Sequence, residues 1–449
     1  MRALATLALA ACTASAPAPI VLPDPGTCAL DPDNALRARC LGAGPLSVGV
    51  VPADGSEPSA TFESDGDEVV LWDLRGDTDY AYELHDARGT RLATFTTGTP
   101  STAPQLEEEL ALGPTRLTDL DRVLFPLTCT DGTALYAIDG AGRLRWYQPL
   151  PDTPAVSGLA LTDRGTIAVT ASRSVIRELG FDGSVVLTAK RGTELDRYVH
   201  HGLVGPDERI LALDDHAVPY DDGLTYLVDG VTEIADGVAT HVWDIAEILD
   251  PRGLPTGDPV YWSLQAPGAV DFGHENGIDV ADDGDWLLTF KQLDLLLRLD
   301  PDHEPRWVLS GGDTPEGGLP PGVPALALTS SAGLDPTFQH PHHPLAAPDG
   351  TLLLLDNGDR GAESRVLQLR IDDEEGTADV VGAWPLGDAC PVQSSAFPLS
   401  DGTLLAACTQ TSRLSELRPG GVVHRRLQVT CADGTVPRGM VGAVPFTRP

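Results

Sequence analysis

The sequence is poor in positive charge. Lys and Arg total 30 against 66 Asp and Glu, which gives a formal net charge of −36. A surface of this sign repels the phosphates of nucleic acid and the headgroups of anionic lipid, so neither is an expected partner. The apolar content of 42% is high enough for a packed core and argues against a disordered chain.

Long hydrophobic runs and several common catalytic motifs are also missing. No segment approaches the roughly 20 consecutive apolar residues that a membrane-spanning helix needs. There is no GxSxG nucleophile motif, no P-loop and no dinucleotide-binding fingerprint. No CxxC or Cys/His spacing supports a zinc site of the finger type. The usual serine hydrolases and nucleotide-binding enzymes are therefore disfavoured.

The N-terminus carries an export signal. One Arg precedes a short apolar run that ends in Leu-Ala-Ala-Cys at Cys12. This resembles the lipobox of bacterial lipoproteins and predicts a signal over residues 1–12, with Cys12 lipidated. The mature chain would be exported and held in the cell envelope, on the periplasmic side, by a lipid anchor only. An ordinary secretory signal cleaved nearby is the alternative. Residues 13–44 are predicted to be a Pro/Ala-rich tether.

The cysteines indicate disulfides. Without Cys12 an even number remains, as expected of an exported chain stabilised by disulfide bonds. Cys28–Cys40 is the most local pairing, and the sequence leaves the others open. The six cysteines are Cys28, Cys40, Cys129, Cys390, Cys408 and Cys431.

Residues 45–104 alternate between short apolar-periodic segments and turn residues, which predicts a small β-sandwich. The segments "YAYELHD" and "RLATFTTG" resemble the late strands of a fibronectin type III-like module. Tyr80 or Tyr82 would then be its corner tyrosine.

Residues 105–449 contain an internal repeat. Each copy is a strand, a tight turn that usually contains Asp-Gly, and a second apolar strand. The spacing predicts an all-β fold, a six-bladed β-propeller of four-stranded blades that follows the sandwich. The six copies span residues 126–139, 158–172, 202–215, 277–291, 344–357 and 397–410.

Histidines precede three successive copies. The distance from the histidine to the turn is nearly the same for His200, His274 and His342, provided that the turn after His274 is one or two residues longer. Since first strands of blades line a propeller's channel, the three side chains should converge at its mouth. Of the pairs His200/His201 and His342/His343, only one member each can face the axis. Three imidazoles could bind a metal or carry out nucleophilic chemistry on an anion.

The order of these motifs resembles the arylsulfate sulfotransferase (arylsulfotransferase, ASST) family of exported bacterial enzymes. The resemblance rests on "VHHGLVGPDE", "DFGHENGID" and "HHPLAAPDGTLLLLDNG" in that order. It implies a small N-terminal β-domain, a six-bladed propeller and a transferase that is independent of PAPS. Such an enzyme moves a sulfuryl group from a phenolic sulfate to a phenol through a sulfohistidine, without a cofactor.

The resemblance also assigns roles to residues. His342 matches the nucleophile, and His200 and His274 match the histidines that flank the sulfuryl group. Lys291 stands where the family usually has an arginine, and keeps its charge without the bidentate fork. No metal ligand is implied. The expected substrate-binding residues are Asn276, His201, His343 and Asn357.

Two other functions remain open from sequence. One is a non-catalytic, lipid-anchored binding propeller. The other is a metal-dependent propeller hydrolase that uses the histidines or the acidic loop "DDHAVPYDDG" at residues 214–223. The sulfotransferase and these two alternatives are each compatible with a homo-oligomer.

Overall fold

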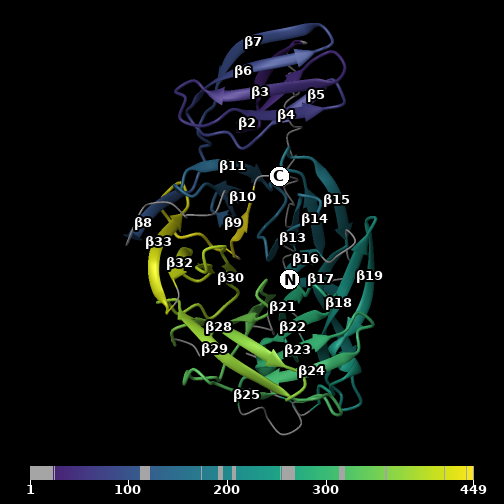
Figure 1. Ribbon diagram of the computed structural model, residues 1–449. Helices are drawn as coiled ribbons and strands as arrows, with labels where there is room; N and C mark the ends of the chain where they lie inside the picture. Colours follow the sequence, from purple (N-terminus) through teal and green to yellow (C-terminus); the bar gives the residue numbers. More distant parts are fainter. Residues whose placement is uncertain are drawn as a thin grey trace, which may run out of the picture. The chain divides into compact units, whose positions relative to one another are not determined.

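The computed structural model describes the chain in two compact units (Figure 1). The described residues are 24, 26–111, 122–172, 174–190, 196–204, 209–252, 254, 268–312, 319–358, 362–418, 420–440 and 442–447, with the backbone alone at 111 and 196–204. Cys12 and the signal lie outside them. Within these residues there is no α-helix, and no helix is long and apolar enough to cross a membrane.

The first unit, Met1–Leu71 with Asp77–Gly98, holds two antiparallel sheets. One has the strand order β1-β2-β5 and the other β4-β3-β6-β7. The strands are β1 (Thr27–Asp31), β2 (Asn34–Leu41), β3 (Leu46–Pro52), β4 (Ala60–Ser64), β5 (Glu68–Leu71), β6 (Asp79–Asp86) and β7 (Gly89–Thr96).

The first two strands fall where the sequence predicted a tether. They pair antiparallel, and the Cys28–Cys40 disulfide joins directly opposed positions of the pair. In β2 the side chains of Leu36, Ala38 and Cys40 are buried, which gives this strand a core face. The Tyr82 hydroxyl accepts a hydrogen bond from the Cys28 N–H at 3.0 Å, so it ties β6 to β1.

Among its described residues, the second unit, Trp72–Gly76 with Thr99–Pro449, contains six sheets that follow one another along the chain. Their strands pair antiparallel, except that β20 pairs parallel with β18 and β25 with β29. The first three have the orders β11-β10-β9-β34, β12-β13-β14-β15 and β16-β17-β18-β19, with β20 also on β18. Their strands are β9 (Arg122–Cys129), β10 (Gly132–Ile138), β11 (Leu144–Pro149), β12 (Gly158–Leu161), β13 (Ile167–Ser172), β14 (Val175–Leu179), β15 (Val185–Lys190), β16 (Asp196–Val204), β17 (Ile210–Pro219), β18 (Thr225–Ala235), β19 (Val238–Asp244), β20 (Ala269–Asp271) and β34 (Val444–Phe446).

The other three sheets have the orders β21-β22-β23-β24, β26-β27-β28-β29-β25 and β30-β31-β32-β33-β8. Two short 3-10 helices, η1 (Ile245–Glu247) and η2 (Lys291–Leu293), follow β19 and β22. The strands are β8 (Gln105–Ala111), β21 (Glu275–Val280), β22 (Trp286–Phe290), β23 (Leu295–Leu299), β24 (Pro305–Ser310), β25 (Ala327–Thr329), β26 (His342–Ala346), β27 (Leu352–Asp356), β28 (Arg365–Asp372), β29 (Thr377–Pro385), β30 (Ser395–Pro398), β31 (Leu404–Cys408), β32 (Arg413–Arg418) and β33 (Val422–Thr430).

The six repeat copies are six hairpins, as predicted, but the first copy has a different place in its sheet. Five copies form the first two strands of their sheets. In the first sheet β34, from the C-terminus, takes that position, so β9 and β10 become its second and third strands. The strands β34, β12, β16, β21, β26 and β30 contact one another in that order, and β30 contacts β34 again. This closed order gives a propeller-like fold.

The core lies between neighbouring sheets. Buried side chains of the third sheet, such as Trp243, pack with those of the fourth, such as Phe290, and similar clusters join each other pair of sheets that are consecutive from the first to the sixth. The second strands β22 and β27 are buried along their whole length. Burial on both faces explains their continuous apolar runs, while the outer strand β15 is largely exposed and mixed in composition.

Both ends of the second unit take part in closing the ring. The strand β8 extends the last sheet, and β34 completes the first. A disulfide between Cys129 and Cys431 joins these two sheets, and a third links Cys390 to Cys408. Three disulfides are consistent with an exported protein.

The ring-closing disulfide should be the most stabilising one in the second unit. It spans 302 residues, against 18 for Cys390–Cys408. On the chain-entropy account, replacing Cys129 and Cys431 by Ser should cost about 2 kcal/mol more than replacing Cys390 and Cys408. Urea unfolding followed by circular dichroism measures both losses. An equal or smaller loss for the first pair would contradict the closure described here.

A buried carboxyl between the fourth and fifth sheets should make stability depend on pH. The Asp279 carboxylate on β21 accepts a hydrogen bond from the Ala346 N–H on β26 at 2.7 Å. Burial raises the pKa of Asp279 from 3.8 to about 7, although this backbone N–H acts to lower it. The folded state therefore binds this proton more tightly than the unfolded state, and loses stability as pH rises from about 4 to about 7.

Asp279→Asn keeps the acceptor oxygen and removes the ionisation. We expect it to raise the free energy of unfolding at pH 8, by at most about 4 kcal/mol, with the gain vanishing near pH 4. Urea unfolding at several pH values measures this difference. Asp302→Asn, in an exposed turn, is the control. A gain that is independent of pH would show that ionisation of Asp279 is not its cause.

Candidate active site

The inner strands of the third, fourth and fifth sheets share one irregularity. Their hairpins close identically, with the last pairs Val204↔Ile210, Val280↔Trp286 and Ala346↔Leu352. In each strand the ladder shifts register a few residues before this pair. Such bulges redirect side chains, and they are common beside active sites.

The common register corrects one alignment made from sequence. The three turns have equal length, so the position of His342 is matched by His200 and by Asn276, four residues before the closing pair. His274 lies two residues earlier and matches His340. These two histidines share a left-handed backbone, with φ of 54° and 51°. The sequence comparison had assumed a longer fourth turn and therefore placed His274 two residues too late.

The imidazole of His342 is buried and held on both nitrogens. Nε2 accepts a hydrogen bond from the Gln393 N–H at 3.2 Å, and Nδ1 lies 3.2 Å from the His340 carbonyl oxygen. A backbone N–H can only donate and a carbonyl can only accept. These partners therefore place the proton on Nδ1 and leave Nε2 with its lone pair. The ring is 1% exposed.

Asn276 joins the fourth sheet to this ring. Its Nδ2 lies 2.9 Å from His342 Nε2 and 3.0 Å from Nδ1, while its Oδ1 accepts a 2.8 Å hydrogen bond from the Thr289 hydroxyl. The threonine thus fixes which end of the amide faces the imidazole. Gly277 permits the close approach of β21 and β26, because a Cβ there would lie 2.6 Å from Pro344 and 2.8 Å from the His343 nitrogen.

His274 is oriented by a carboxylate. Its Nδ1 lies 3.0 Å from Asp271 Oδ2, which also accepts from the Gln292 side chain at 3.3 Å. Its carbonyl accepts the Lys291 N–H at 3.0 Å, so the backbone of η2 lies beside the histidine. The Lys291 side chain is half-buried.

Two further carboxyls are buried near His274. Burial, with the neighbouring charges of Asp271 and Asp215, holds the pKa of Asp229 well above its usual range. Burial likewise raises the pKa of Glu275, with smaller contributions from Asp229, Asp214 and Asp244. Both shifts favour the uncharged form of these carboxyls, so burial works against a build-up of negative charge in this region.

The other predicted residues occupy different surroundings. His343 stacks edge-on against Phe397, with ring centroids 4.7 Å apart. Asn357 is buried, and its amide donates to the carbonyls of Cys390 and Gln393. Its observed contacts thus support the loop that carries the Gln393 N–H. The side chains of His200 and His201 lie outside the described residues, and only their place on β16 is known.

Sequence reasoning missed the parts of the site that come from distant segments. Thr289 could have been found, because it opposes Gly277 in the fourth hairpin. Gln393 carries no such signal, since it lies 51 residues from His342 in an irregular loop. Gln393 and Ser394 both have positive φ, 50° and 80°, an uncommon backbone for residues other than glycine.

Solved structures with similar folds are all distant in sequence. A protein of unknown function from Bacteroides caccae is 13% identical, with a TM-score of 0.43, covering 73% of this chain and 100% of its own. Virginiamycin B lyase from Staphylococcus aureus is 12% identical, with a TM-score of 0.35, covering 72% and 74%. The soluble aldose sugar dehydrogenase from Escherichia coli is 15% identical, with a TM-score of 0.39, covering 65% and 96%. Similarity this low carries no argument about function.

The match to a protein family is more informative. No curated protein matches the chain. The family model for arylsulfotransferase (ASST) matches residues 101–387, well over half of the 449-residue chain. The matched range contains His200, His274, Asn276, Lys291 and His342. The chain belongs to the arylsulfotransferase (ASST) family, whose members are sulfotransferases acting on small phenolic substrates.

Proposed function

We propose that this protein transfers a sulfuryl group from a phenolic sulfate ester to a phenol, through a sulfohistidine formed on His342. One observation carries the proposal. Hydrogen bonds from Gln393 and to His340 keep the proton on Nδ1, so Nε2 has the lone pair that a nucleophile needs. Family membership supplies the reaction class.

In the first half-reaction, His342 Nε2 attacks the sulfur of the donor ester. The N–S bond forms while the bond from sulfur to the phenolic oxygen breaks. The departing phenolate takes a proton from His274 or His200. Asp271 holds the His274 ring through Nδ1, so the opposite edge of that ring would face the leaving group.

In the second half-reaction, an acceptor phenol loses its proton to the histidine that acted as acid. Its oxygen then attacks sulfur, the S–O bond forms, and the N–S bond to His342 breaks. Both half-reactions balance without a cofactor, because the donor ester carries the activated group. Ping-pong kinetics follow from the covalent intermediate.

Access to His342 requires a local change. Since the ring is buried and Nε2 faces the Gln393 N–H, the sulfuryl group must take the place of that donor. The same N–H is then available to a sulfuryl oxygen. The amide of Asn276 is a second donor at this position. Backbone and amide donors of this kind stabilise charge that develops on oxygen during transfer.

The acidic composition need not repel the substrate. Burial raises the pKa of Asp229 and of Glu275, which disfavours their negatively charged forms near the site. Lys291, whose backbone is hydrogen-bonded to His274, is the proposed cationic partner of the sulfuryl oxygens. A local cation can outweigh the net field of an acidic surface at short range.

We further infer a six-bladed propeller over about residues 105–449 and a fibronectin type III-like fold for the first unit. Six sheets in closed order support the first inference, and two sheets of three and four strands support the second. We also infer that Cys12 carries a lipid anchor on the periplasmic side of the envelope, on the lipobox-like "LAAC".

Sulfuryl transfer from 4-nitrophenyl sulfate to phenol, by protein lacking residues 1–12, tests the function. We expect nitrophenol release that depends on phenol and falls at least about 1000-fold in His342→Ala, because the nucleophile is gone. His303→Ala, on the turn after β23, should retain activity. Circular dichroism confirms folding. A folded wild-type protein that transfers nothing from several donors would instead favour the binding propeller.

Thr289→Val tests whether the threonine positions Asn276. Valine has the same shape but cannot donate to Asn276 Oδ1, so the amide loses its fixed orientation toward His342. We expect kcat to fall about tenfold, as for the loss of roughly one hydrogen bond, with KM little changed. Thr289→Ser restores the hydroxyl and should restore kcat. Equal losses in both variants would indicate a packing effect.

A further inference from the structure

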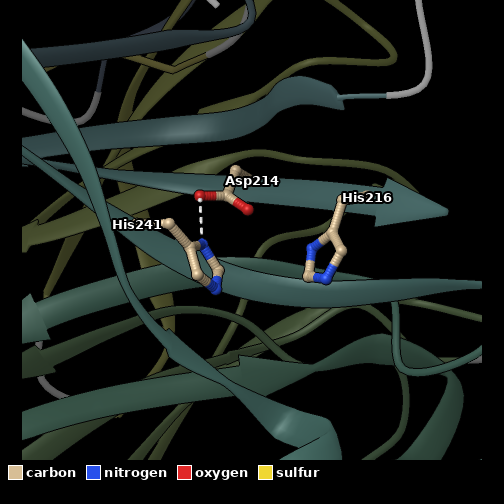
Figure 2. A group of neighbouring side chains, drawn as sticks. All are labelled: Asp214, His216 and His241. Carbon is tan, nitrogen blue, oxygen red and sulfur yellow. Dashed lines mark hydrogen bonds and ion pairs between the residues drawn. The ribbon is translucent and has the colours of Figure 1, made fainter. Parts of the chain in front are cut away.

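A second cluster of chemically active side chains lies on the third sheet, apart from His342. Asp214 and His216 are two residues apart on β17, so they project from the same face of the sheet. His241 and Asp244 come from β19. Figure 2 shows Asp214, His216 and His241 facing a common space.

A glycine allows these side chains of β17 and β19 to approach one another. On the intervening strand β18, Gly230 pairs with Asp214 on one side and with Asp244 on the other. A Cβ at Gly230 would lie 2.7 Å from the His241 ring and 2.9 Å from Asp244 Oδ1. The absent side chain therefore leaves the space through which the groups of β19 reach those of β17.

The spacing of the donor atoms suits a small cation. One ligand atom from each of Asp214, His216 and His241 lies within 4.8 Å of the others. His241 Nδ1 is 3.3 Å from Asp214 Oδ2, His241 Nε2 is 3.1 Å from Asp244 Oδ1, and His216 Nδ1 is 3.6 Å from the same Oδ1. Ligands at about 2.0–2.1 Å from a tetrahedral zinc ion are separated by about 3.3 Å.

The surrounding charge also favours a cation. Glu275 is buried, and neither carboxyl oxygen has a hydrogen-bond partner among the described residues. The charges of Asp214 and Asp244 act on this carboxyl from the cluster. Asp214 and Asp244 bring two carboxylates into the cluster, and a divalent ion would offset the repulsion between these two groups.

We propose that Asp214, His216 and His241 form a binding site for one divalent transition-metal cation of the zinc class, with Asp244 as a fourth ligand. Carboxylates bind all of these cations, but the two imidazoles favour zinc-class ions over calcium and magnesium, which take oxygen ligands. The metal would fasten the outer strand β19 to β17 across β18. It has no assigned part in sulfuryl transfer.

A proton on His241 competes with the metal. Hydrogen bonds to Asp214 and Asp244 raise the pKa of His241 from 6.5 to about 10, so the imidazole can itself act as the cation of this cluster. If the cluster were only an ion pair without a metal, it would need no residues other than His241, Asp214 and Asp244. His216 distinguishes the two accounts, because its Nδ1 is buried and has no hydrogen-bond partner among the described residues.

The test is zinc binding by purified protein after dialysis against EDTA. Competition with a chromophoric chelator should give one equivalent of Zn²⁺ per chain, with a Kd below about 1 µM, and zinc should raise Tm. His216→Ala should weaken binding at least about tenfold and abolish the rise in Tm. His85→Ala, which removes an exposed histidine that contacts only Glu83 and Thr90 through its ring nitrogens among the described residues, is the matched control and should change neither.

Several results would overturn the proposal. One is wild-type binding no tighter than that of folded His216→Ala, which would leave the ion pair as the whole role of the cluster. Another is loss of zinc in His342→Ala but not in His216→Ala, which would move the metal to the central histidines. If His216→Ala does not fold, His241→Gln in the same measurements replaces it. Binding of Ca²⁺ or Mg²⁺ in preference to Zn²⁺ would contradict the donor set.

Discussion

Closure of the sheets on one another is the constraint on which the site depends. His342 and Asn276 belong to different sheets, and their 2.9 Å contact exists only because β21 and β26 lie side by side. A ring of inner strands can hold that spacing only if its last sheet is fixed to its first. The C-terminal strand β34 and the Cys129–Cys431 disulfide provide this connection. Residues with no chemistry of their own therefore set the geometry of the nucleophile.

Burial limits the negative charge near the proposed sulfuryl site. It raises the pKa of Asp229 and of Glu275, which favours their uncharged forms. Asp271 instead contacts His274 and Gln292 through its carboxylate. The carboxyls close to the reaction are therefore either shifted toward the uncharged form or paired with a neighbouring side chain. The net charge of −36 describes the outer surface more than it describes the site.

Much of the fold could be predicted from the sequence, because the hairpins are local. Tight Asp-containing turns between apolar strands indicate all six, and the family resemblance identified His342. The sequence comparison placed His274 two residues too late, because it assumed a longer turn after β21, whereas the three hairpins close identically. The inner place of β34 and the hydrogen bond from Gln393 depend on segments far apart along the chain. Reasoning from local sequence patterns detects neither of these two contacts. It also missed the strand pair β1–β2, where a proline-rich start suggested a tether.

The use of both ends of the second unit to close the ring has a consequence for how the protein folds. The inner edge of β9 is covered only when β34, more than 300 residues later in the chain, pairs with it. Contacts between such distant segments form slowly, since a large loop must be ordered first. While the chain folds, the first sheet therefore presents an open strand edge until β34 has paired with β9. An uncovered edge invites pairing with other chains, so the period before closure is when this protein is most exposed to aggregation.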